Sequence, residues 1–113
     1  MTKFKFFKND NNFVGFECSG HTGYDDYGKD ILCATISGIT QSVVLGLTKV
    51  LNIKIGLKRN DKKGHLKVEL PKDINSTQMR EAQVLIGTLY ESISDLIIGY
   101  SGYISMEVIE NVY

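Results

Sequence analysis

The chain has 113 residues, 13 Lys plus Arg against 13 Asp plus Glu, and 2 cysteines. This length fits a single domain spanning residues 1–113, and the 42% hydrophobic content can form a buried core, which excludes a disordered tail. A formal net charge of zero argues against a protein held to nucleic acid mainly by phosphate neutralisation. The cysteines are too few for a disulfide framework.

The N-terminal region predicts the cellular compartment. Lys3, Lys5 and Lys8 interrupt the phenylalanines of residues 1–12, so this region lacks the apolar core of a signal peptide. No stretch approaches about 18 uncharged apolar residues, so we expect no membrane-spanning segment. We therefore predict a cytoplasmic protein in which both cysteines stay reduced.

The first elements are a strand pair and a loop. Lys3-Phe4-Lys5-Phe6 alternates polar and apolar residues, which predicts a half-buried strand. The polar cluster at residues 9–12 predicts a turn, and residues 13–18 predict a second strand, so the two should form an antiparallel hairpin. Residues 19–29 are polar and contain several glycines, which indicates a mobile loop.

A helix follows this loop. Asp30 is a good N-cap candidate, because its carboxylate can accept hydrogen bonds from the first-turn N–H groups. Residues 31–51 carry few charges and many apolar side chains, which predicts a helix that is apolar over much of its surface. Such a helix should lie in the middle of the domain or at a subunit contact.

The middle of the chain predicts a second strand pair. Apolar and polar residues alternate over residues 53–58, which indicates a third strand. Residues 60–64 have turn composition, and residues 66–70 alternate again, giving a fourth strand that stops at Pro71.

The C-terminal part predicts a helix and a short strand. The helix should start near Asn75 or Ser76, because apolar residues then recur at helical spacing, and it should end at Gly99 or Gly102. Residues 104–108 indicate a last strand. The predicted order is ββαββαβ, an α+β fold with two helices packed on a mostly antiparallel sheet.

One cysteine occupies a position suited to nucleophilic chemistry. If Asp30 caps the helix, Cys33 is the third helical residue, where the helix dipole and unpaired N–H groups favour the thiolate. His21 stands at the other end of the loop and can fold back to take the thiol proton. The helix start also offers N–H groups, including that of Cys33, to an oxyanion. A buried inert cysteine and a solvated loop histidine are the common alternative, since no fixed spacing defines such pairs.

A longer motif surrounds this pair. Gly20-His21, followed by Tyr24-x-Asp26-Tyr27-Gly28-x-Asp30-Ile31-x-Cys33-Ala34-x-x-Ser37, resembles the motif of the bacterial ribosomal-processing cysteine protease family, Prp. The resemblance implies a homodimeric cysteine-type endopeptidase that removes the N-terminal extension of large-subunit ribosomal protein twenty-seven. It implies an extended peptide substrate with two aromatic residues before a small residue at the cut. His21 and Cys33 would be the catalytic pair, and we expect no metal or other cofactor.

The resemblance also implies supporting residues. Gly20, Asp30 and Ser37 match further family positions. Asp30 would orient His21 instead of, or as well as, capping the helix. Ser37 lies four residues after Cys33, on the same helix face, where its hydroxyl can support the site. Alternatively, Ser37 is a small residue that lets a neighbour pack closely.

The loop between the pair would contact the substrate. We expect the segment Tyr24-Asp25-Asp26-Tyr27-Gly28 to act as a lid whose carboxylates attract a basic peptide, with a solvated loop as the alternative. Thr22 stands where the family commonly has Ala, and Leu32 stands where it commonly has Val. Neither departure removes a reacting group, so we expect only loop details to differ.

A basic strand-pair tip supports a rival function. Lys58, Arg59, Lys62 and Lys63 cluster at residues 58–63. A non-enzymatic, ribosome-associated module could bind RNA or protein through this tip, although charges there more often keep an edge strand soluble. We expect no direct nucleic-acid binding.

A zinc site is the second rival. Cys18 and His21 have Cys-x-x-His spacing, and Cys33 and His65 would complete a set of four ligands. The pattern lacks a second closely spaced pair, which disfavours zinc. Cys18, at a strand end, then acts as a small hydrophobic residue.

Overall fold

The computed structural model describes residues 1–26 and 30–111. Its elements follow the predicted ββαββαβ order, which confirms the α+β class. They are β1 (Thr2–Asn9), β2 (Asn12–Ser19), α1 (Ile31–Leu45), the π-helical turn η1 (Gly46–Val50), β3 (Gly56–Asn60), β4 (His65–Glu69), α2 (Ser76–Tyr100) and β5 (Ile104–Glu110).

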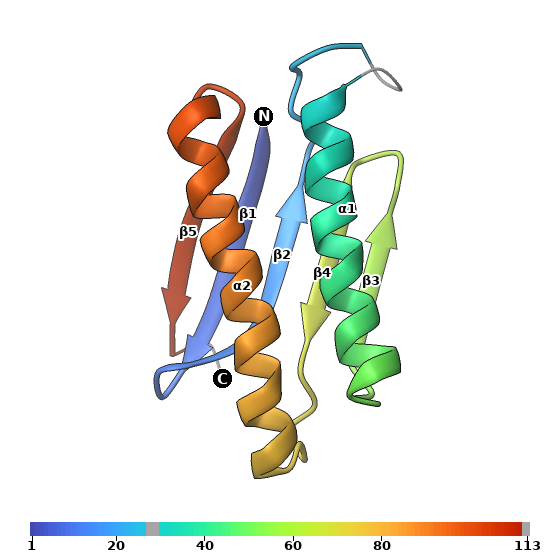
Figure 1. Ribbon diagram of the computed structural model, residues 1–113, viewed down its shortest axis with the longest axis vertical. Helices are drawn as coiled ribbons and strands as arrows, with labels where there is room; N and C mark the ends of the chain where they lie inside the picture. The colour runs from blue at the N-terminus through green and yellow to red at the C-terminus, as the bar shows by residue number, and fades with distance from the viewer. Residues whose placement is uncertain (27–29, 112–113) are drawn as a thin grey trace.

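The strands form one mixed sheet covered on one face by both helices (Figure 1). The strand order is β3-β4-β2-β1-β5, and every neighbouring pair is antiparallel except β1 and β5. The predicted β1–β2 pairing is confirmed, with Phe4 opposite Cys18 and Phe6 opposite Phe16. Because side chains alternate along a strand, these buried phenylalanines face the helices and Lys3 and Lys5 face the other side.

The core lies between the sheet and the helices. The ring of Phe6 is fully buried and contacts the rings of Phe4, Phe13, Phe16 and Tyr90. Burying one such side chain contributes about 1.5–3 kcal/mol. The helices add further buried side chains to this cluster: Leu32, Ile36, Val43, Val44 and Leu47 from α1 and η1, and Ala82, Ile86, Leu89 and Ile93 from α2. This packing holds the start of α1 beside the end of β2 and the start of β4.

The first helix begins at the predicted residue but does not continue regularly. Its α-helical part ends at Leu45, and the predicted last turn is π-helical over Gly46–Val50. Gly46 lies against α2, because a Cβ there would meet Leu85 Cδ1 at 2.8 Å. The close approach of the two helices at this glycine has no signal in the hydrophobic pattern.

The segment Ile31–Val50 is 20 residues long and apolar enough to cross a membrane by length and composition. The expectation that no stretch would reach this level is therefore wrong. In the structure this segment packs on one face of the sheet (Figure 1), and its Ile36 and Leu47 side chains are buried in the core.

The third strand is displaced from its predicted position. Residues 53–58 alternate, but the paired strand is Gly56–Asn60, and the turn follows at residues 61–64. Ile53 is buried beneath the end of η1, where its N–H donates to the carbonyl of Leu47. Packing at the helix end thus removes Ile53 from the strand.

The second helix begins as predicted and ends differently. Asn75 is the N-cap, and its side chain accepts from Gln78 N at 2.8 Å. The helix ends at Tyr100 with Ser101 in right-handed conformation, so neither Gly99 nor Gly102 supplies a left-handed cap. The strand that follows is β5, as predicted.

Candidate active site

A cleft of about 620 Å³ opens at the start of α1. Its walls come from α1, the end of β2, the loop that follows β2, and the β3–β4 turn. It brings together residues that the sequence separates widely, including all five predicted catalytic and supporting residues: Gly20, His21, Asp30, Cys33 and Ser37.

Cys33 and His21 face one another across this cleft. The Sγ atom of Cys33 lies 3.9 Å from Nδ1 of His21. Cys33 is held by the first turn of α1, and His21 by the loop after β2. Both side chains are half-buried, so each is accessible from the cleft. The separation suits proton transfer between thiol and imidazole.

The backbone of the β3–β4 turn fixes the orientation of His21. Nε2 of His21 lies 3.0 Å from the carbonyl oxygen of Lys62. Because a carbonyl only accepts, Nε2 carries the hydrogen, and Nδ1 of the neutral ring is the basic nitrogen that faces Cys33. The neighbouring turn residue Lys63 accepts from Gly20 N at 3.2 Å, which anchors the residue before His21.

Two glycines allow this close approach. Gly20 has φ +85°, and a Cβ there would lie 2.5 Å from the carbonyl oxygen of Met1. Gly64 has φ +60°, and its Cβ would lie 2.6 Å from Gly20 O and 3.2 Å from His21 Cε1. A side chain at either position would displace backbone, so glycine is required for His21 to sit against the turn.

Asp30 connects the loop to the helix. Its Oδ1 accepts from Cys33 N at 2.9 Å, which confirms the predicted N-cap. Its Oδ2 accepts from the hydroxyl of Thr22 and from the N–H groups of Tyr24 at 3.1 Å and Asp25 at 3.4 Å. Burial raises the pKa of the Asp30 carboxyl, but the Thr22 hydroxyl and these N–H groups outweigh it, so the pKa is lowered. Asp30 is therefore an anion at neutral pH.

The cap changes one sequence expectation. The N–H of Cys33 already donates to Asp30, and the N–H of Ala34 donates to the Asp30 carbonyl at 3.0 Å. We expected the Cys33 N–H to be available to an oxyanion, and the capping bond contradicts this. A direct hydrogen bond from His21 to Asp30, the other predicted role of this carboxylate, stays a prediction.

Thr22 is the residue that sequence reasoning undervalued. We treated it as a loop detail, but it is 2% exposed and its hydroxyl donates to Asp30. The available signal was a hydroxyl-bearing side chain directly beside His21.

Cys18 lies in the same cleft in different surroundings. Burial, followed by the charge of Glu17, raises the pKa of the Cys18 thiol to about 11. The Cys18 thiol is consequently protonated at neutral pH, and its side chain packs against the core. These surroundings agree with the predicted packing role.

Of the remaining predicted residues, Asp25 and Ser37 line the cleft. Ser37 is exposed on the same helix face as Cys33, and Asp25 is exposed in the loop after β2. Tyr24 packs edge-on against Tyr100 and Tyr103, so this part of the loop rests on the end of α2. Asp26 is exposed, and Tyr27 and Gly28 lie outside the described residues.

The basic tip and the proposed zinc ligands have other partners. Arg59 pairs with Asp61 at 3.3 Å, and both side chains are exposed at the cleft. Nε2 of His65 lies 2.7 Å from Oε2 of Glu17. Over residues 1–26 and 30–111, no group of three or more His, Cys, Asp and Glu side chains is placed to hold a metal ion.

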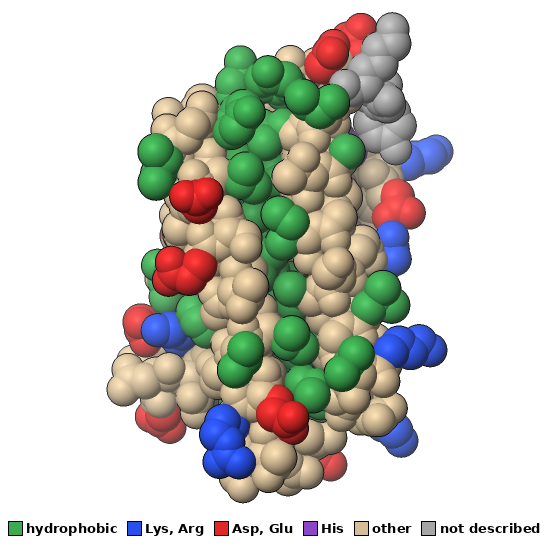
Figure 2. Space-filling model, in the orientation of Figure 1, with side chains coloured by type: hydrophobic (Ala, Val, Ile, Leu, Met, Phe, Trp, Pro, Cys, Tyr) green, Lys and Arg blue, Asp and Glu red, His purple; other side chains and the backbone are tan. Residues whose placement is uncertain are grey.

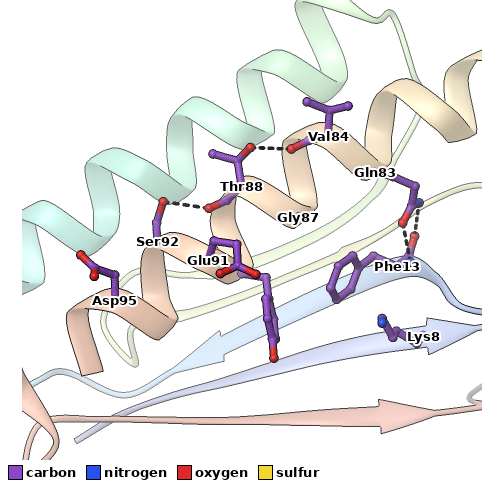
Figure 3. Close-up of a pocket in the computed structure, with 10 residues that line it drawn as sticks. Lys8, Phe13, Gln83, Val84, Gly87, Thr88, Glu91, Ser92 and Asp95 are labelled. Carbon is purple, nitrogen blue, oxygen red and sulfur yellow. Dashed lines mark hydrogen bonds between the residues drawn. The ribbon is translucent and has the colours of Figure 1, made fainter. Parts of the chain in front are cut away.

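A second, open hollow of about 740 Å³ runs along the middle of α2 (Figure 3). The side chain of Gln83 brackets Phe13 there, accepting from its N–H at 2.6 Å and donating to its carbonyl at 2.8 Å. Lys8 lies over the Phe13 ring at 4.8 Å. The described residues that line this hollow include neither cysteine nor histidine, so the candidate site is the cleft at α1.

The cleft pairs a thiol at a helix start with an oriented imidazole in an α+β fold, an arrangement that fits a cysteine peptidase. The comparison with protein families agrees. The family model for cysteine protease Prp matches residues 1–105, so the chain belongs to the Prp family of cysteine proteases.

Individual relatives support the same assignment. The ribosomal processing cysteine protease Prp of Bacillus subtilis (strain 168) is 22% identical over 87 residues, covering 77% of this chain and 78% of the relative. The fold matches the S. aureus ribosomal processing protease Prp with a TM-score of 0.85 at 22% identity, covering 96% and 99% of the two chains. It also matches SMU.848 from Streptococcus mutans with a TM-score of 0.84 at 21% identity, covering 98% and 96%.

Proposed function

We propose that this cysteine protease removes the N-terminal extension of large-subunit ribosomal protein twenty-seven, with Cys33 as nucleophile and His21 as base. The observation that carries the site assignment is the 3.9 Å approach of Cys33 Sγ to His21 Nδ1. The B. subtilis relative is a ribosomal processing protease, and the S. aureus protein has been solved with a substrate peptide and with a covalently linked product peptide.

The proposed reaction follows from this geometry. Nδ1 of His21 takes the Cys33 proton, and the sulfur attacks the scissile carbonyl to give a tetrahedral oxyanion. The imidazolium then returns the proton to the leaving amine, and the C–N bond breaks to leave a thioester on Cys33. A water molecule, deprotonated by His21, hydrolyses the thioester and restores the thiol. Throughout the reaction the Lys62 carbonyl accepts a hydrogen bond from Nε2 of His21, which lies 3.0 Å away, and this bond stabilises the imidazolium.

The cleft suits an extended peptide. It runs from the loop residue Gly23 along α1 to Thr40 and Gln41, past Cys33. We propose that the substrate carries two aromatic residues before a small residue at the cut. The apolar lining of the cleft near Cys33 and His21 includes Ile36 and Leu66, which can contact aromatic side chains of the substrate.

The test is cleavage of a synthetic peptide that spans the N-terminal extension, followed by mass spectrometry. A scrambled peptide of the same composition is the control. We expect a single cut before the small residue in the first peptide and none in the second. Equal cutting of both peptides, or no cutting of either, would contradict the proposed substrate.

We further propose that the protein acts as a cytoplasmic homodimer. Hydrophobic side chains gather along the boundary between the two helices (Figure 2). Several apolar side chains of α1, η1 and α2 are largely exposed: Ile31, Leu45, Val50, Val84 and Ile98. A helical face that exposes so many apolar side chains is suited to contact with a second subunit.

A further inference from the structure

Thr22 follows His21 in the loop after β2, and its buried side chain contacts Asp30 at the start of the helix that carries Cys33. It is 2% exposed, and its hydroxyl donates to Oδ2 of Asp30. We propose that Thr22 is a positioning residue that holds His21 at its working distance from Cys33 by anchoring the loop to the Asp30 carboxylate. The inference rests on the proposed roles of Cys33 and His21.

The two oxygens of Asp30 serve different segments of the chain. Oδ1 accepts from Cys33 N at 2.9 Å and thus holds the start of α1. Oδ2 accepts from Thr22, from Tyr24 N at 3.1 Å and from Asp25 N at 3.4 Å, all in the loop. One carboxylate therefore sets the position of the loop relative to the helix.

Thr22 is the part of this connection closest to the base. Its backbone is bonded directly to His21, whereas the other loop donors to Oδ2 lie further along the chain. Asp30 is 8% exposed, so solvent cannot fully replace a lost donor. Without the Thr22 hydroxyl, the loop between Gly20 and Tyr24 loses its side-chain anchor to the helix start.

Displacement of His21 changes the pH dependence of Cys33 reactivity, whereas a simple loss of folding stability does not. An imidazole close to the thiol favours the thiolate, and a misplaced imidazole favours it less. The other titratable or charged side chains that line the cleft are Cys18, Asp25, Asp30, Arg59, Asp61 and His65. Of these only Asp30 hydrogen-bonds to the Thr22 hydroxyl. Carboxylic acids titrate well below neutral pH, so a change in the pH profile of Cys33 around neutral pH reports on His21.

The test compares Thr22→Val, which keeps the shape and removes the hydroxyl, with Thr22→Ser, which keeps the hydroxyl. The rate of Cys33 alkylation by iodoacetamide is measured by peptide mapping from pH 5 to pH 10, beside the thermal unfolding midpoint, with His21→Ala as reference. We expect Thr22→Val to slow alkylation at pH 7 by about tenfold and to shift the profile to higher pH, as His21→Ala does. Thr22→Ser should match the wild-type profile.

A lower unfolding midpoint combined with a wild-type pH profile in Thr22→Val would overturn the proposal, because the hydroxyl would then be only structural. If Thr22→Val does not fold, Thr22→Ala replaces it, and a wild-type profile for Thr22→Ala overturns the proposal equally. Alkylation needs no peptide substrate. A profile that depends on Thr22 therefore supports the inference even if the protein fails to cut the proposed peptide.

Discussion

At the scale of single residues, the two cysteines have different surroundings within one cleft. Both line the cleft, but Cys18 extends from β2 into the core and its thiol pKa is raised to about 11. Cys33 lies in the first turn of α1 with His21 beside it. The sequence predicted the place of Cys33 in the first turn, since a cysteine three residues after an N-cap aspartate has a defined position on the helix.

Asp30 gives a prediction at the same scale. Asparagine can still accept from Cys33 N, but its amide group would then face the Thr22, Tyr24 and Asp25 donors. We expect Asp30→Asn to lower the free energy of unfolding at pH 7 by about 1–3 kcal/mol. Urea unfolding of both proteins between pH 7 and pH 3 measures this difference.

The pH dependence has a definite sign. The pKa of Asp30 is lowered in the folded state from its ordinary value of 3.8, so its ionised form contributes stability above that pH. This contribution is lost as the pH falls below that value through the folded-state pKa, and the difference between wild type and Asp30→Asn should shrink there. Asp95→Asn, at an exposed position on α2, is the control. A difference that does not change down to pH 3 would contradict the ionised cap.

At the scale of elements, the backbone of the β3–β4 turn holds the His21 side chain. The sequence predicted that this basic tip keeps the edge soluble or binds a partner, because side-chain charge is visible in a sequence and the direction of a backbone carbonyl is not. The carbonyls of Lys62 and Lys63 accept from His21 and Gly20 respectively. This support requires the loop after β2 to lie against the β3–β4 turn. The two segments are distant in the sequence, and neither periodicity nor turn composition predicts that they meet.

Gly64 tests this support. In Gly64→Ala the new Cβ would meet Gly20 O at 2.6 Å and His21 Cε1 at 3.2 Å. Gly23→Ala is the matched control, because Gly23 also has a positive φ of +71° but has no atom within 4 Å of the added Cβ. Both variants should lose about 1 kcal/mol from backbone strain.

Only Gly64→Ala should displace His21, so we expect its kcat/KM for the peptide to fall by about 10²-fold. Gly23→Ala should stay much closer to wild type. Kinetic assays and thermal unfolding of both variants give the comparison. Equal losses of activity in the two variants would show that strain alone, and not contact with His21, causes the effect.

At the scale of the whole molecule, the hydrophobic pattern of the sequence predicted the order of strands and helices more completely than the residues at which they begin and end. Alternation, helical spacing and capping residues are properties of local sequence, and they predicted the order of strands and helices, the first strand pairing, the Asp30 N-cap and the start of the second helix. The displaced third strand, the π-helical turn and the Ser101 helix end depend on packing between distant segments. Ile53, which leaves its predicted strand to pack in the core, is the clearest example.

The exposed apolar side chains of the helical face predict a dimer at this scale. The monomer mass is 12.6 kDa, so a homodimer has a mass of about 25 kDa. Sedimentation equilibrium at micromolar concentrations should give the larger value. A mass that stays at 12.6 kDa across that range would contradict the proposed dimer.

The central claim is that Cys33 is the nucleophile, and the cleavage rate of Cys33→Ala tests it most directly. The initial rate of peptide cleavage by wild type, Cys33→Ala and Cys18→Ala is measured by mass spectrometry. We expect Cys33→Ala to lose at least about 10³-fold in rate, because the other thiol in the cleft, Cys18, has a pKa raised to about 11 and is protonated at neutral pH. Cys18→Ala should keep most of the activity. Cleavage at the same bond that survives Cys33→Ala would contradict the assignment.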